Sequence, residues 1–229
     1  MAPVSVTSKE KIFQQLRADI ISRHLKPGQA IREVELAQKY DMSRTPIREI
    51  LWRLEQEDLV RIVPTRGAFV SDLTAKDIAE VFEIRLSLEC PAARRAAKRM
   101  NDEYLTQLFE IKSQLETAAT LQDSLTLFKA DSQLHKLIFV VAGNTRAHRI
   151  MRNLMGQVLR VSLMSTPSPE RINSAVNEGK RIVEALVEGN QDSAREAMRL
   201  HLDRTMEGLL PLSDIDRKFE EFMRSSIYI

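Results

Sequence analysis

The N-terminal third of the chain alternates short helical patterns with turns. Apolar residues recur at helical spacing through residues 8–23, and a Leu-Lys-Pro-Gly turn ends this pattern. A second short pattern covers residues 32–40, and a third begins directly after Ser43, a residue type that suits a helix N-cap. From Leu59 the spacing changes to two around a Pro-Thr-Arg-Gly turn, which predicts a small β-hairpin. Residues 1–72 are therefore predicted to form one domain of three helices and a hairpin.

The rest of the chain, residues 73–229, carries helical patterns only. Amphipathic runs are separated by Gly-Asn and Pro-Ser-Pro breaks and cover residues 74–92, 102–119, 122–142, 145–165, 169–188 and 191–209, with a last piece at 215–223. Helices joined by short turns typically form an antiparallel bundle. The predicted fold is mostly α, with an N-terminal winged helix-turn-helix over 1–72 and an antiparallel bundle of six to seven helices over 73–229.

Composition narrows the class of protein. Seven glycines in 229 residues are few for a fold that needs many tight turns between strands, so a mostly helical fold is favoured. The net charge is +2, and the small positive excess lies within residues 1–72, which is compatible with nucleic-acid binding. A single cysteine, Cys90, excludes an intramolecular disulfide and a finger-type zinc site. The chain lacks a signal peptide, and it also lacks an apolar run long enough to cross a membrane. We therefore expect a cytoplasmic protein with no membrane partner.

The third predicted helix has the pattern of a DNA-reading helix. When its apolar positions face the core, Arg44, Thr45 and Arg48 point outward. Arginine pairs with the two acceptors of guanine, and an arginine beside Gly67 at the tip of the hairpin, Arg66, suits a narrow minor groove. The alternative interpretation is a solvated basic face on a small helical domain. Trp52, on the same helix, is interpreted as a packing residue.

The same segment resembles a known family of bacterial regulators. The motifs that carry the resemblance are Leu25-Lys26-Pro27-Gly28, Glu33-Val34-Glu35-Leu36-Ala37, Ser43-Arg44-Thr45-Pro46-Ile47-Arg48-Glu49, Asp58-Leu59-Val60 and Arg66-Gly67-Ala68-Phe69-Val70. They are similar to the winged helix-turn-helix of the GntR family. The resemblance implies DNA contacts from Arg44, Thr45 and Arg48, with Ser43, Arg66 and Gly67 assisting and Arg32 on a phosphate.

Polar residues inside the predicted bundle form a second candidate site. Asp131 and His135 are one helical turn apart among apolar residues, and His201 lies on the last main helix. One carboxylate and two imidazoles can hold a divalent metal with open positions for water or a ligand. An ordinary surface pair between Asp131 and His135 is the alternative.

The bundle also resembles the helical FCD effector-binding domain of the FadR-type branch of GntR regulators. Arg85 with Glu89, Asp131 with His135, Gly143-Asn144 and His201 match its pattern. The resemblance implies a small organic acid effector held by Arg85, Glu89 and Asn144. In metal-binding members, an aspartate, a histidine one turn later and two histidines 22 residues apart surround the ion, and here Gly179 stands 22 residues before His201. We therefore predict a three-ligand site of Asp131, His135 and His201 for one zinc or similar ion, or, without metal, direct binding of a carboxylate by Arg85.

These observations lead to one main hypothesis and two rivals. The main hypothesis is a ligand-responsive transcriptional regulator, acting as a repressor, that binds a palindromic DNA operator as a homodimer and is not an enzyme. It would act in the bacterial cytoplasm, at the nucleoid. The first rival is a helical-bundle metalloenzyme with an accessory winged-helix domain. The second is a winged helix used for protein contacts, which gives no reason for the outward Arg44 and Arg48.

Overall fold

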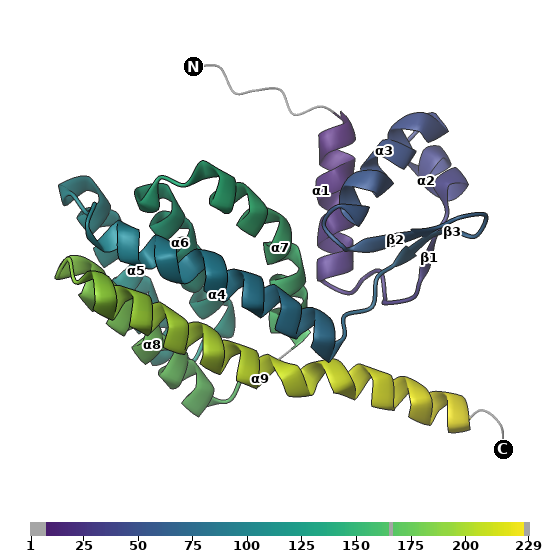
Figure 1. Ribbon diagram of the computed structural model, residues 1–229. Helices are drawn as coiled ribbons and strands as arrows, with labels where there is room; N and C mark the ends of the chain where they lie inside the picture. The colour runs from purple at the N-terminus through teal and green to yellow at the C-terminus, as the bar shows by residue number, and fades with distance from the viewer. Residues whose placement is uncertain (1–7, 165–166, 227–229) are drawn as a thin grey trace. The chain divides into compact units, whose positions relative to one another are not determined.

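The computed structural model describes residues 8–164 and 167–226, and these residues form two compact units (Figure 1). Of the described residues, the first unit comprises those up to Thr74 together with Asn153–Met164, and the second comprises Ala75–Arg152 together with residues 167–226. The elements in chain order are α1 Ser8–Ile21, β1 Ala30–Ile31, α2 Glu33–Lys39, α3 Arg44–Glu55, β2 Val60–Val63, β3 Gly67–Val70, α4 Ala75–Ala97, α5 Asp102–Leu121, α6 Ser124–Ala142, α7 Thr145–Met164, α8 Pro169–Val187 and α9 Gln191–Ser226.

The first unit is a winged helix-turn-helix built on one apolar core. The core side chains come from α1, α3 and the sheet and include Leu16, Ile20, Ile47, Ile50, Leu54 and Leu59. Strand β3 lies between β1 and β2 in an antiparallel sheet, with Phe69 opposite both Ala30 and Arg61. The predicted hairpin is confirmed as β2 and β3. Strand β1 was not predicted because two residues are too few to establish an alternating pattern.

The second half of α7 packs on this first unit. Gln157 Nε2 donates to Asp58 Oδ2 at 3.0 Å, and Arg160 Nη2 donates to the carbonyl of Ser71 at 2.7 Å. Asp58 has a φ of 52°, a conformation that favours glycine but that aspartate tolerates better than most residues. Sequence periodicity had assigned all of α7 to the bundle, because an amphipathic pattern does not state which core a helix faces.

The second unit is the predicted helical bundle. Helix α4 packs against α9, which runs antiparallel to it, and against α6, while α5 packs against α6 and α8 (Figure 1). Its core includes Phe82, Leu108, Leu115, Leu134, Ile138 and Ile182. The expected separate helix at 215–223 was wrong, because α9 continues as one helix across Pro211 to Ser226. Proline removes one backbone donor, and a helix can continue through it. No helix in the described part of the chain is long and apolar enough to span a membrane.

Candidate functional site

The outward side of α3 is the first candidate surface. Ile47, Ile50, Leu51 and Leu54 are buried, so the helix turns Arg44, Thr45 and Arg48 to its exposed side, as the pattern predicted. Ser43 occupies the N-cap position of α3, and its side chain makes no capping hydrogen bond. The free amides at this helix start therefore stay available to an anion such as a phosphate.

Surface ion pairs surround this side of α3. Arg48 Nε donates to Glu33 Oε2 of α2 at 2.8 Å, and Arg32 pairs with Glu35 at 3.2 Å. Arg48 is 63% exposed, so its guanidinium can exchange Glu33 for another acceptor at little cost. The basic residues predicted to contact DNA thus lie at the surface, and Arg48 and Arg32 are held by acidic partners that DNA could replace.

The β2–β3 turn forms the wing. Gly67 has a φ of 96° and Thr65 a φ of 64°, so the turn uses two residues in left-handed backbone conformations. Arg66 is exposed, and its guanidinium lies 5.9 Å from the centre of the Phe69 ring. This arrangement presents one cation at the tip of the wing.

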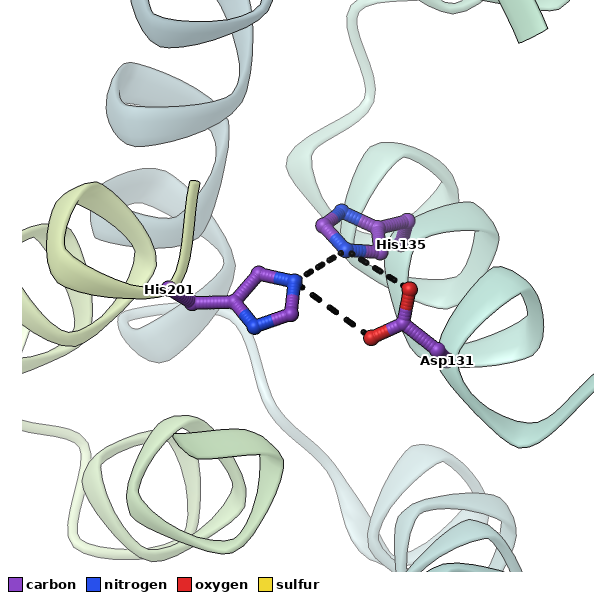
Figure 2. A group of neighbouring side chains, drawn as sticks. All are labelled: Asp131, His135 and His201. Atoms are coloured by element: carbon purple, nitrogen blue, oxygen red, sulfur yellow. Dashed lines mark hydrogen bonds and ion pairs between the residues drawn. The ribbon is translucent and has the colours of Figure 1, made fainter. Parts of the chain in front are cut away.

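Three side chains in the helical unit converge on one point (Figure 2). Asp131 and His135 come from α6, and His201 comes from α9. The two Nε2 atoms of His135 and His201 are 3.2 Å apart. The Asp131 carboxylate oxygens lie 3.6 Å from Nε2 of His135 and 3.4 Å from Nε2 of His201. The sequence placed Asp131 and His135 together, and packing of α9 adds His201.

A buried carboxylate holds the far nitrogen of each imidazole. Nδ1 of His135 contacts Glu89 of α4, and Nδ1 of His201 lies 3.3 Å from Oε2 of Glu178 on α8. Arg85 Nε donates in turn to Glu89 at 2.6 Å, and both of these side chains are almost fully buried. Hydrogen bonding at Nδ1 fixes the ring orientation, so the Nε2 atoms remain directed at the shared point.

The charges of this cluster strongly shift the pKa values of its side chains. Burial raises the pKa of Glu89, but the charges of Arg85 and His135 outweigh it and lower the pKa to about 2. For His135, burial lowers the pKa, but Glu89 and Asp131 outweigh it and raise the pKa to about 9. The pKa of Asp131 is held well below its usual range, because His135 and His201 outweigh the opposing effect of burial. The cluster therefore favours a positive charge among its carboxylates, which a proton or a cation can supply.

The donor atoms fit a divalent metal ion. Ligands about 2.0–2.1 Å from a tetrahedral zinc ion lie roughly 3.3 Å from one another, close to the observed separations. A histidine is absent at Gly179, and a Cβ there would lie 2.9 Å from Cδ1 of Leu115, which is fully buried. The chain thus offers one carboxylate and two imidazoles, and the first carbon of any side chain at position 179 would meet the buried Leu115 side chain.

The structure gathers most of the residues that the sequence assigned to this site. Arg85, Glu89, Asp131, His135 and His201 form one cluster, whereas no hydrogen bond in the described residues joins Asn144 to it. Instead, Asn144 Oδ1 accepts from the amide of Ala147 at 3.1 Å near the start of α7. Sequence reasoning missed Glu178; a carboxylate in the apolar stripe of Ala175, Ile182 and Ala185 was the available signal.

Comparison with known proteins agrees with this two-part structure. Residues 8–70 match the model described as bacterial regulatory proteins, gntR family, and residues 80–204 match the FCD domain model. The HTH-type transcriptional repressor RspR of Escherichia coli strain K12 is 28% identical over 200 residues, which cover 87% of this chain and 88% of RspR. The structure of E. coli McbR/YncC shares the fold, with a TM-score of 0.74 and 19% identity over 89% of this chain and 97% of that chain.

The family also decides between the hypotheses drawn from the sequence. The gluconate operon transcriptional repressor of Bacillus licheniformis is 30% identical over 144 residues, 63% of this chain and 59% of that protein. These relatives are regulators, so the metalloenzyme alternative is not retained and the protein is not an enzyme. With the FCD model alone spanning more than half of its residues, this chain belongs to the GntR family of bacterial transcriptional regulators, in the group that carries an FCD domain.

Proposed function

We propose that the protein is a repressor that binds a palindromic operator as a homodimer and responds to a small organic acid bound at the Asp131–His135–His201 centre. It would do so at the nucleoid, in the bacterial cytoplasm. Two identical heads related by a two-fold axis match two half-sites of a palindrome, and the FCD unit is the larger body available for pairing. The relatives named as repressors support the direction of regulation.

DNA reading is assigned to α3 and the wing. Arg44 and Arg48 lie one turn apart on the exposed side of α3, where each can reach a guanine edge or a phosphate. Arg48 would exchange its ion pair with Glu33 for DNA. Thr45 and the free amides after Ser43 add contacts at the helix start, and Arg66 beside Gly67 would enter the minor groove.

The observation that carries the effector proposal is the pair of buried carboxylates behind the two histidines. Glu89 and Glu178 orient His135 and His201, an arrangement typical of metal-binding histidines. A bound zinc or similar ion would supply positive charge and open coordination positions for a carboxylate oxygen. Arg85 already forms an ion pair with Glu89. Its role in this proposal is therefore to hold that carboxylate in place rather than to bind the effector.

Metal content and operator binding together test the proposal. We expect protein purified without chelator to carry up to one zinc-type ion per chain by elemental analysis, and His201→Ala to carry none. His148→Ala is the matched control and should keep its metal, because His148 stacks on Phe139 and does not belong to the three-donor group. Operator fragments selected from random DNA should then be released by a carboxylate effector from the wild type and not from His201→Ala. Metal-free wild type, or equal release from both proteins, would contradict the effector site.

The homodimer has its own test. Sedimentation of the full chain at micromolar concentration should give twice the chain mass of 26.2 kDa. Selected operators should contain inverted half-sites about one helical turn or less apart, because each small head covers few base pairs. A monomer that binds a single half-site would contradict this part of the proposal.

A further inference from the structure

Trp52 is the single tryptophan of the chain, and it lies on the outside of α3. The residue is 64% exposed, so the packing role expected from the sequence is wrong. The structure describes every residue of α3, and Trp52 is the one exposed apolar residue among them. A large apolar group held in water on a fixed helix loses the hydrophobic stabilisation that contact with a partner would give it.

The neighbours of Trp52 show which side of α3 it occupies. Ion pairs tie one edge of the helix to α1 and the other edge to α2. These pairs are Lys9–Glu49, Glu10–Arg53 and Glu33–Arg48. Between the two edges lie Thr45 and Trp52, seven residues and therefore about two turns apart. The indole thus shares its side of the helix with a residue already assigned to DNA.

We propose that Trp52 is a specificity-determining residue that contacts the C5-methyl group of a thymine in the major groove. The inference rests on the proposed role of α3 as the DNA-reading helix. Apolar contact with this methyl group is how an apolar side chain distinguishes bases, since the methyl marks thymine alone. Along α3, Trp52 lies roughly 10 Å beyond Thr45 at 1.5 Å per residue, a span over which a helix in the groove presents several side chains to bases.

Tryptophan fluorescence offers a direct test in the unmodified protein, because every photon of indole emission comes from residue 52. Addition of the selected operator should shift the emission to shorter wavelength and reduce quenching by acrylamide. Random DNA of equal length should change both signals less. Emission and quenching that do not respond to operator at saturating concentration overturn the proposal.

A double-mutant cycle identifies the contacted group. Deoxyuridine replaces each thymine of the operator in turn and removes the methyl group alone. The wild type should lose about fourfold in affinity at one position of each half-site, the amount expected for one buried methyl group. Trp52→Ala should bind the unmodified operator roughly tenfold more weakly and be insensitive to deoxyuridine at that position. If Trp52→Ala weakens binding equally on the thymine and deoxyuridine operators at every position, the indole does not contact a thymine methyl group. That result overturns the thymine assignment.

Control variants separate this inference from the proposed function. Phe109, an aromatic residue of α5, is 52% exposed. Phe109→Ala should leave operator affinity unchanged. If Arg48→Ala loses specific binding while Trp52→Ala does not, the role of α3 stands and the role of Trp52 is overturned. If neither variant affects specific binding, the DNA-reading role of α3 itself fails. Should Trp52→Ala change the sedimenting mass and not the affinity per dimer, the indole belongs to an interface between copies and the proposal is overturned.

Discussion

In the two units of this protein, the ion pairs at the candidate sites are placed in opposite ways. In the winged unit, pairs such as Glu33–Arg48 lie at the surface, where water screens the charges and the ion pair can break at little cost. In the helical unit, Arg85 is 2% exposed and Glu89 is 1% exposed, and neither can be released without leaving a charge in the core. The first arrangement suits residues that must change partner on binding DNA. The second suits residues that must hold two imidazoles in one orientation.

The largest expected effect comes from opening the buried network. Glu89→Ala removes the partner of Arg85 and of His135 together, and we expect a loss of about 3–5 kcal/mol in the free energy of unfolding. Glu49→Ala, which removes the surface pair with Lys9, should change it by less than about 1 kcal/mol. Urea denaturation of both variants measures the difference. Similar losses for the two variants would mean that the two units do not differ as described.

The next effect is the pH dependence of the buried network in metal-free protein. The folded-state pKa of His135 is raised to about 9 by Glu89 and Asp131 against the opposing effect of burial, whereas an unfolded histidine titrates near 6.5. Its stabilising contribution is therefore complete below pH 6.5 and is lost as the pH rises through about 9. The expected loss is on the order of 3 kcal/mol.

Denaturation in the presence of chelator at several pH values between 6 and 9.5 measures this loss. His135→Gln cannot gain the proton and is the control, with a flatter profile over the same interval. A wild-type profile that stays level would show that His135 is neutral in the folded protein.

A smaller effect is expected at the surface of the winged unit. Arg48→Ala should cost about 1–3 kcal/mol on a selected operator and relax its sequence preference, with less effect on random DNA. Glu33→Ala removes the partner that holds Arg48 and one negative charge beside the DNA, so it should tighten binding to random DNA slightly. Both are measured by fluorescence anisotropy at fixed salt. Equal losses of Arg48→Ala on operator and random DNA would assign Arg48 to phosphate alone.

The last prediction concerns Gly179. Metal-binding members of the family have a histidine at this spacing, so Gly179→His would be expected to add a ligand, but its Cβ would meet Cδ1 of Leu115 at 2.9 Å. We now expect the single variant to lose about 1–3 kcal/mol of stability through overpacking. The double variant Leu115→Ala with Gly179→His should regain much of this loss and bind zinc more tightly than the wild type. Calorimetric zinc titration and urea denaturation test this, with Leu115→Ala alone as the control.

The sequence predicted the three helices and the hairpin of the winged unit because these signals are local, and it missed β1 and the packing of the second half of α7 on this unit. Helical spacing within α3 is enough to place Arg44 and Arg48 outside and Ile47 and Ile50 inside. The same reasoning failed for Trp52, since hydrophobicity predicts a burial preference and a functional surface can override it. The roles of these residues on DNA stay predictions.

For the helical unit, the sequence predicted the helices and the two site residues that lie one helical turn apart on α6. The spacing of Asp131 and His135 placed their side chains together, because residues four apart share a helix face. The contacts of His135 with Glu89 and His201 join residues 46 and 66 positions apart, and no pattern within a single helix contains that information. Glu178 stood out within its own helix as a carboxylate in an apolar stripe, but its contact with His201, 23 positions away, could not be read from that pattern.

The contact between Gly179 and Leu115 constrains how this protein can evolve. A histidine that appears first at position 179 meets the Leu115 side chain, and an alanine that appears first at position 115 leaves a cavity that typically costs about 2–5 kcal/mol. Either order passes through a less stable ancestor, so the two positions are epistatic. The glycine is therefore entrenched: with this packing, a four-ligand centre is not expected to arise by single neutral steps.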